Sequence, residues 1–238
     1  DKNLNYLPLS GLSNRKTIHC NENGYYSIYQ SDRFGFNTPD EEWDKDKIDY
    51  LLVGDSHTHG ACVNEPDTIS GNLRKLNNNE NGVLNLGQHN TGPLTEYAIL
   101  REYLPLKKVK RVLWMYFDND LKDLSGELKN KILVNYFKDR NFSQNIILKK
   151  QEIKKLQLKK LEQEVLKQER AEKERFFEPI WFIRLSSVRK IIFPALVSDP
   201  PFPKEFENII KLSNKLTKEN NSKLYFVHLP DYTRYISK

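Results

Sequence analysis

The sequence has few cysteines and no long hydrophobic run. It contains two cysteines, Cys20 and Cys62, among 238 residues. No stretch reaches about 20 apolar residues, the length that a membrane-spanning helix needs. The cysteines form neither a CxxC pair nor a zinc-ligand spacing, and the GxGxxG and Walker patterns are absent. These absences exclude a membrane-spanning helix and argue against zinc and nucleotide sites, so we expect no metal and no cofactor.

Charged residues, in contrast, are abundant and of both signs. The 38 Lys and Arg against 32 Asp and Glu give a net charge of +6, and charged residues make up 29% of the chain. One stretch, 149–175, holds ten basic and six acidic residues and so contributes 10 − 6 = +4. Mixed-sign charge along a helix is typical of a solvated face. The composition therefore predicts a folded core with one strongly solvated segment and no nucleic-acid partner.

Short apolar runs alternate with helical patterns over much of the chain. The runs read as buried strands, and the segments between them carry apolar residues at helical spacing. This alternation favours parallel βαβ units and a doubly wound α/β sheet. The predicted strands are 48–54, 82–87, 111–117 and 223–229, and the predicted helices are 68–76, 94–104 and 205–217.

Three segments complete the predicted organisation. Residues 1–47 are turn-rich and predict an irregular or hairpin extension. Residues 48–142 and 194–238 form the α/β domain, which we expect to be incomplete at its C-terminal end. Residues 143–193 predict a helical insertion, because they hold a long glycine-free run of strong helix formers up to Pro179.

The insertion offers two candidate interaction segments. The stretch 146–175 is either a passive exposed helix or an arm for self-association or a partner. The stretch 180–193 is amphipathic, with Trp181, Leu185 and Val188 on one face. Such a segment suits a peripheral membrane contact, but packing onto the domain is the favoured interpretation.

Polar residues with catalytic potential follow three consecutive predicted strands. Asp55 and Ser56 come directly after the first, Gly87 ends the second, and Asn119 and Asp120 follow the third. Strand ends of a parallel sheet gather at one edge, so a hydroxyl, a bare backbone N–H and a side-chain amide would converge there. Acyl transfer needs such a set, a nucleophile and donors for the developing negative charge.

The GDSHTHG stretch (54–60), the Gly87 loop and the Asn119-Asp120 pair together resemble the first three blocks of the SGNH/GDSL hydrolase family. SDRFGFN (31–37) and NLGQHNTGPLTEYAILREYL (85–104) further resemble an unassigned bacterial branch of it. The resemblance covers about 48–121 and implies a flavodoxin-like three-layer α/β/α fold. It also implies serine-dependent hydrolysis or transfer of an acyl ester, with a small acyl-ester or glycan substrate. By this likeness Ser56 is the nucleophile and its amide is the first oxyanion donor, with the Gly87 amide as the second and the Asn119 side chain as the third. Asp55 is expected to support this site by capping the helix that follows it.

Two features depart from the family pattern. Phe117 stands where the third block usually has glycine, and no Asp-x-x-His spacing exists for the general base. The simplest expectation is that the base lies beyond Lys238; His59, His89 and His228 are substitutes. His57, His59, His89 and Asp120 are otherwise expected to shape the pocket. The alternative functions are an inactive SGNH-fold binding or scaffold protein, or an assembly module that uses the helical arm.

Cys20 and Cys62 leave two interpretations open. They form a disulfide that fastens the N-terminal extension to the domain if the protein is exported, or they remain buried thiols. The chain starts at Asp1 without an apolar leader, which indicates either a trimmed targeting segment or a fragment. The cell envelope or periplasm is the favoured location over the cytoplasm.

Overall fold

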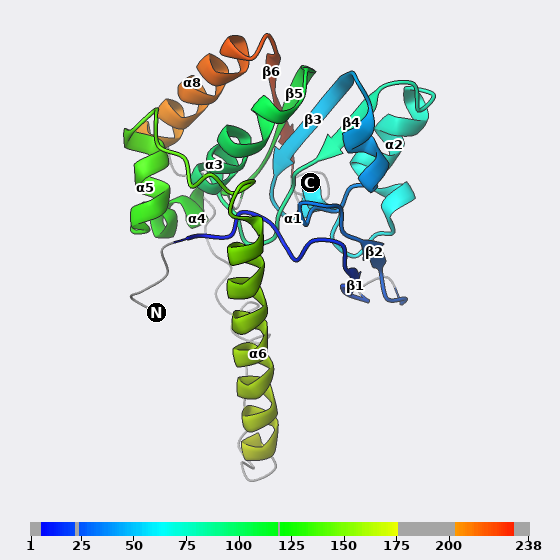
Figure 1. Ribbon diagram of the computed structural model, residues 1–238, viewed down its shortest axis with the longest axis vertical. Helices are drawn as coiled ribbons and strands as arrows, with labels where there is room; N and C mark the ends of the chain where they lie inside the picture. The colour runs from blue at the N-terminus through cyan, green and yellow to red at the C-terminus, as the bar shows by residue number, and fades with distance from the viewer. Residues whose placement is uncertain (1–5, 22–23, 119, 176–202, 231–238) are drawn as a thin grey trace, which may run out of the picture.

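The computed structural model describes residues 6–21, 24–118, 120–175 and 203–230. Its centre is a four-stranded parallel sheet in the order β4-β3-β5-β6 (Figure 1). The strands are β3 (Ile48–Gly54), β4 (Gly82–Asn85), β5 (Val109–Phe117) and β6 (Lys223–Leu229). All four predicted strands are present, with β4 ending and β5 beginning two residues earlier than expected. The predicted α/β fold with a parallel sheet flanked by helices is confirmed.

The helices that flank the sheet also follow the predicted pattern. The predicted helices correspond to α2 (Ile69–Leu76), α3 (Pro93–Tyr103) and α8 (Lys204–Glu219). Two further helices, α4 (Asp120–Glu127) and α5 (Lys131–Lys138), were not predicted. Helices α4, α5 and α8 all contact α3, whereas α2 packs against β4 (Figure 1).

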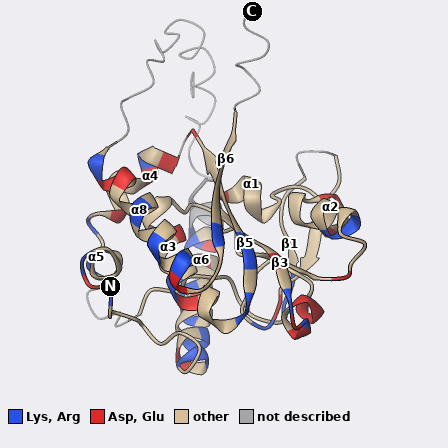
Figure 2. Cartoon of the chain, turned by 90° about the horizontal axis from the view of Figure 1, so that it is seen from above, with Lys and Arg blue, Asp and Glu red and all other residues tan. Residues whose placement is uncertain are grey.

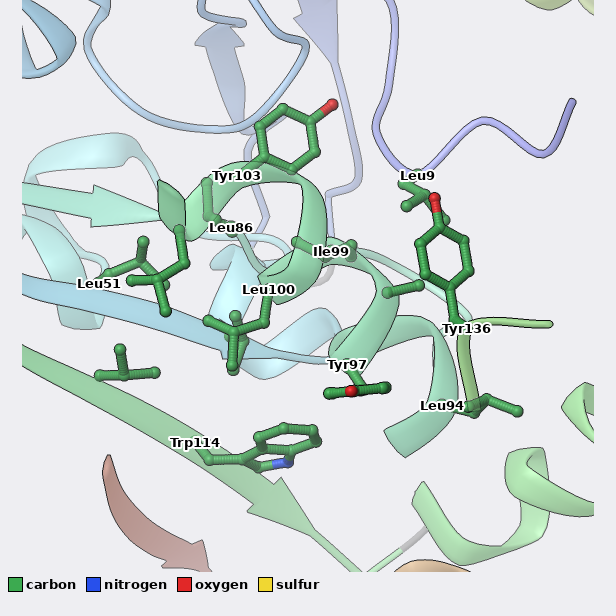
Figure 3. Packing of buried hydrophobic residues seen from close by; sticks show 14 of the residues in the cluster. Leu9, Leu51, Leu86, Leu94, Tyr97, Ile99, Leu100, Tyr103, Trp114 and Tyr136 are labelled. Atoms are coloured by element: carbon green, nitrogen blue, oxygen red, sulfur yellow. The ribbon is translucent and has the colours of Figure 1, made fainter. Parts of the chain in front are cut away.

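The main core lies between the sheet and α3. Leu51 and Trp114 point from the sheet toward Leu100 and Tyr97 of α3, and each of these side chains is almost completely buried (Figure 3). Because other elements surround α3, most of its circumference is buried. Burial of this kind is the dominant favourable contribution to folding, and it fixes the strands whose ends carry the candidate site.

The N-terminal region forms a small two-stranded lobe. Strands β1 (Lys16–Ile18) and β2 (Ile28–Gln30) pair antiparallel, as a hairpin extension predicts. Behind them the buried carboxylate of Asp32 accepts hydrogen bonds from the amides of Phe34, Gly35 and Phe36 and from the Trp43 indole N–H. This single side chain therefore holds the chain in a tight turn before β3.

A disulfide joins this lobe to the domain. The Cys20 and Cys62 sulfurs are bonded at 2.03 Å across a sequence separation of 42 residues. The sequence leaves a disulfide and two buried thiols as alternatives, and the structure contains the disulfide. Cys62 lies just after α1 (Ser56–His59), so the bond fastens the lobe to the segment that follows this helix.

The predicted helical insertion is present as α6 (Lys150–Arg175), which extends away from the sheet (Figure 1). Its first turns are anchored by the buried Ile153 and by Gln157, whose amide donates to the carbonyls of Ser10 and Gly11. Acidic and basic residues both occur along it (Figure 2). Residues 180–193 lie outside the described residues. Among the described helices, none has the length and apolarity to cross a membrane.

Candidate functional site at the sheet edge

The strand order of the sheet reverses next to β3. After β3 the chain moves to one side to form β4 and then crosses to the other side to form β5. Ligands of open α/β sheets bind outside the carboxyl ends of the strands at such a reversal of order. The residues that follow β3, β4 and β5 therefore define the candidate site.

Ser56 lies at the first position of α1, directly beyond β3. Asp55 is the residue before this helix, and its Oδ1 accepts from the His57 amide at 2.9 Å. Such a side-chain cap fixes the first turn of a helix. Gly54 has no room for a side chain, because a Cβ there would lie 2.7 Å from the Met115 carbonyl oxygen. The local sequence thus holds the Ser56 backbone in a defined place at the sheet edge.

Gly87 packs directly against α1. A Cβ at this position would lie 2.7 Å from the Thr58 carbonyl carbon and would overlap the His59 amide nitrogen. The following residue, Gln88, donates its amide to the Gly54 carbonyl at 3.0 Å. The loop after β4 and the helix after β3 are therefore in contact, as the convergence of strand ends requires.

The Gly87 amide already has a hydrogen-bond partner. It donates to Asn85 Oδ1 at 3.0 Å, while the Asn85 amide group donates to the Thr58 carbonyl at 2.8 Å and contacts Ser70 Oγ at 3.2 Å. The side chain of Asn85 is completely buried, so it acts as a brace between β4 and α1. An oxyanion that used the Gly87 N–H would have to share it with Asn85.

The third contribution comes from the turn after β5. Asp120 Oδ2 accepts from the Phe117 amide at 2.9 Å and so ties the first residue of α4 to the end of β5. Asn119 itself, the predicted third oxyanion donor, lies outside the described residues. Phe117 stacks on the His57 ring with 4.0 Å between ring centroids. The departure from glycine at this position thus provides a ring contact between α1 and the end of β5.

The His57 ring is half exposed and is held on a second side by Asp55. His57 Nδ1 lies 3.1 Å from Asp55 Oδ2, so the imidazole is fixed between a carboxylate and an aromatic ring. That His57 shapes a pocket stays a prediction. Among the described residues, no hydrogen bond joins an imidazole to the Ser56 hydroxyl.

His59 and His89 form a separate cluster with His19. His59 Nδ1 and His89 Nε2 are 3.0 Å apart, and His19 stacks on His89 with 4.2 Å between ring centroids. Burial lowers the pKa of His59 to about 3 and that of His89 to about 4, with the neighbouring histidines adding to the effect. Both rings are therefore neutral at physiological pH and link the loop after β4 to the N-terminal lobe.

His228 is paired with a carboxylate that no local spacing in the sequence indicates. It lies on β6 opposite Tyr116 of β5, and its Nε2 is 2.9 Å from Asp118 Oδ1. The two residues are 110 positions apart in sequence, so only strand pairing brings them together. Because the carboxylate occupies Nε2, Nδ1 is the ring nitrogen left to accept a proton, the reverse of the usual triad, in which the carboxylate holds Nδ1.

Two acidic residues, of which sequence reasoning missed one, are buried behind the site. Glu96 of α3 and Asp120 are both 0% exposed, and only Asp120 was a predicted pocket residue. A glutamate on a predicted helix normally lies in solvent. The sequence signal for burial is that Ile99 and Leu100, which share its side of the helix, are apolar.

One cluster of potential metal ligands occurs within the described ranges. The ligand atoms of His19, Cys20 and Cys62 lie within 4.8 Å of one another, but both sulfurs are committed to the disulfide. The candidate site at the sheet edge contributes no residue to this cluster.

Comparisons with known proteins add no name to this site. No family model, no curated protein and no solved structure matches the chain.

Proposed function

We propose that the protein is a serine esterase or O-acyltransferase of the SGNH type that acts on an acyl ester, including esters carried by carbohydrates. Ser56 is the nucleophile in this proposal, and its own amide, the Gly87 amide and the Asn119 side chain stabilise the oxyanion. The observation that carries the proposal is the contact of three strand ends: Gly87 packs against Thr58 of α1, and His57 of α1 stacks on Phe117 of β5. Acyl transfer requires such a convergence of hydroxyl and donors.

A groove beside the site supports a neutral, hydroxyl-bearing substrate. It has a volume of about 490 Å³ and begins at Gln88 and His89, the residues that follow Gly87. Its described lining holds two acidic residues, Asp123 and Glu127, and no Lys or Arg. An acidic wall disfavours an anionic ligand, whereas amides, hydroxyls and carboxylates all hydrogen-bond to sugar hydroxyls.

The test is covalent labelling of the full chain with a fluorophosphonate, which reacts with activated serines. We expect labelling of the wild type and its loss in Ser56→Ala. The exposed serine of α4 provides the matched control, so Ser125→Ala is expected to label like the wild type. Labelling that survives Ser56→Ala, or a wild type that does not label, contradicts the proposed nucleophile.

The same assay identifies the base. If the His228–Asp118 pair activates Ser56, His228→Gln lowers the labelling rate by about 10²–10⁴-fold, the usual contribution of a general base. Unchanged labelling in His228→Gln assigns the base to another group. Transfer and hydrolysis are then separated by supplying an acyl ester with and without a sugar acceptor.

A second candidate function is an inactive fold that binds the same ligand. Two observations favour it, the engaged Gly87 amide and the lack of an imidazole hydrogen-bonded to Ser56 in the described residues. Saturable binding of a neutral glycan ester without turnover or labelling is the outcome that supports this candidate.

A further inference from the structure

Two carboxyl groups are buried together behind the candidate site with too few hydrogen-bond donors. Neither carboxyl oxygen of Glu96 has a hydrogen-bond partner, and the same holds for Asp120 Oδ1. The remaining oxygen, Asp120 Oδ2, accepts from the Phe117 amide at 2.9 Å. Three buried oxygens are therefore left without a donor in the described part of the chain.

Ionised carboxylates do not persist in such surroundings. A charge removed from water needs an opposite charge or several hydrogen bonds, and otherwise the group takes up a proton. Burial raises the pKa of Glu96 well above its usual range, and the carboxyls of Asp120, Glu127 and Asp55 add to the rise. The indole of Trp114 opposes it, but its N–H is itself without a hydrogen-bond partner.

The surroundings of Asp120 act in the same direction. Burial raises the pKa of Asp120 from 3.8 to about 8, and Asp55 and Asp123 add to the rise. The Phe117 amide and His57 oppose it. The charged groups near the two carboxyls are thus mostly acidic, namely Asp55, Asp123 and Glu127. Among these neighbours, His57 is the one that can carry a positive charge.

We propose that Glu96 and Asp120 are held as protonated carboxyls at neutral pH and form an uncharged pair that positions the turn after β5. Through its bond to the Phe117 amide, Asp120 holds the end of β5 against the start of α4. Loss of its proton would place a negative charge beside Asp55, next to the place where the proposed oxyanion develops. The catalytic part of this inference rests on the proposed function, whereas the protonation of the pair does not.

The proposal predicts a direction of pH dependence. Because the folded-state pKa of Asp120 lies above its unfolded value, the stability that this group contributes is fully present below about pH 4 and is lost as the pH rises through about 8. Under the proposed function, the rate is expected to fall on the alkaline side of the same pH, by about tenfold per pH unit.

Infrared spectroscopy of the wild type tests the protonation directly. A protonated carboxyl absorbs on the high-frequency side of the amide band, where a carboxylate does not. We expect this signal at pH 6 and its partial loss between pH 7 and 9. Glu96→Gln and Asp120→Asn should each remove part of it. Absence of the signal from the wild type at pH 6 overturns the proposal without any need for a folded variant.

Unfolding as a function of pH provides a second test with a matched control. Gln and Asn imitate the protonated acids, so Glu96→Gln and Asp120→Asn are expected to unfold at a higher temperature than the wild type at pH 9. Glu127 serves as the control because it accepts from the amides of Gly92, Leu94 and Thr95. Glu127→Gln is therefore expected to destabilise the protein while leaving the alkaline loss of stability in place.

The outcomes separate the two proposals. Equal destabilisation of Glu96→Gln, Asp120→Asn and Glu127→Gln at all pH values would show that the pair is ionised and overturns the inference. If the protein has no esterase activity, the infrared and unfolding results still decide the protonation. If the protein is active and Asp120→Asn still loses rate at alkaline pH, the positioning role is contradicted but the protonation of the pair is not.

Discussion

Position 87 has no room for a side chain, and this lack of space, rather than backbone flexibility, accounts for the glycine. The position faces the backbone of Thr58 and His59 in α1, and a methyl group would overlap it. The same closeness brings the loop after β4 into contact with α1. A residue that the family resemblance marks as an oxyanion donor therefore has a packing role that the structure shows independently.

This packing gives a residue-scale prediction. Gly87→Ala is expected to destabilise the protein by about 1–3 kcal/mol, because α1 or the loop must move to admit the new methyl group. Chemical denaturation measures the loss. The control is Gly126 in α4, where a Cβ would meet no atom within 4 Å. Gly126→Ala should be neutral or stabilising by up to about 1 kcal/mol, and an equal loss in both variants would contradict the role of packing.

At the scale of elements, the sequence predicts the strands better than the shorter helices. The four strands are apolar runs bounded by turn residues, so their signal is local. In α5 the β-branched and aromatic residues weaken the helical signal. The helix is fixed instead by Asn130, whose side chain accepts from the amides of Ile132 and Leu133, and by burial of Tyr136.

The candidate site shows the same division between local and long-range information. Ser56, Gly87 and the turn before Asp120 could be predicted because each follows a strand. The pairing of His228 with Asp118 depends on the register of β5 and β6. The burial of Glu96 depends on α4, which was not predicted. Interactions between distant segments leave no spacing in the sequence, and these are the ones that were missed.

The long helix α6 is anchored at one end. Ile153 is 5% exposed and belongs to the main core, whereas Leu161 is 51% exposed. We expect Ile153→Ala to reduce the free energy of unfolding by about 2–4 kcal/mol and Leu161→Ala to change it by no more than about 0.5 kcal/mol. Equal effects in urea denaturation would contradict the one-ended attachment.

The exposed part of α6 keeps the association hypothesis open to a direct test. Leu161, Val165 and Leu166 are each more than two-fifths exposed, and they form the contact surface if α6 is an arm for self-association rather than a passive exposed helix. Leu161→Glu combined with Leu166→Glu should then lower the mass measured by light scattering to that of a monomer. A wild type that is already monomeric at high concentration would contradict self-association.

At the scale of the whole molecule, the disulfide joins the N-terminal lobe to the domain. A bond across 42 residues restricts the unfolded chain, and the corresponding stabilisation is about 4 kcal/mol. We therefore expect Cys20→Ser with Cys62→Ser, or reduction by a dithiol, to lower the free energy of unfolding by about that amount. Denaturation with and without reductant measures it, and an unchanged midpoint would contradict the prediction. Such a bond favours an oxidising compartment.

The strand order also has a consequence for the time course of folding. β3 pairs with β4 on one side and with β5 on the other, so the second partner is synthesised only after α3 has followed β4. Until residue 117 has left the ribosome, one full edge of an apolar strand stays open to other chains. Substitutions that weaken the pairing of β3 with β5 should therefore lower the yield of soluble protein during synthesis, even where they change the free energy of unfolding of the folded protein only slightly.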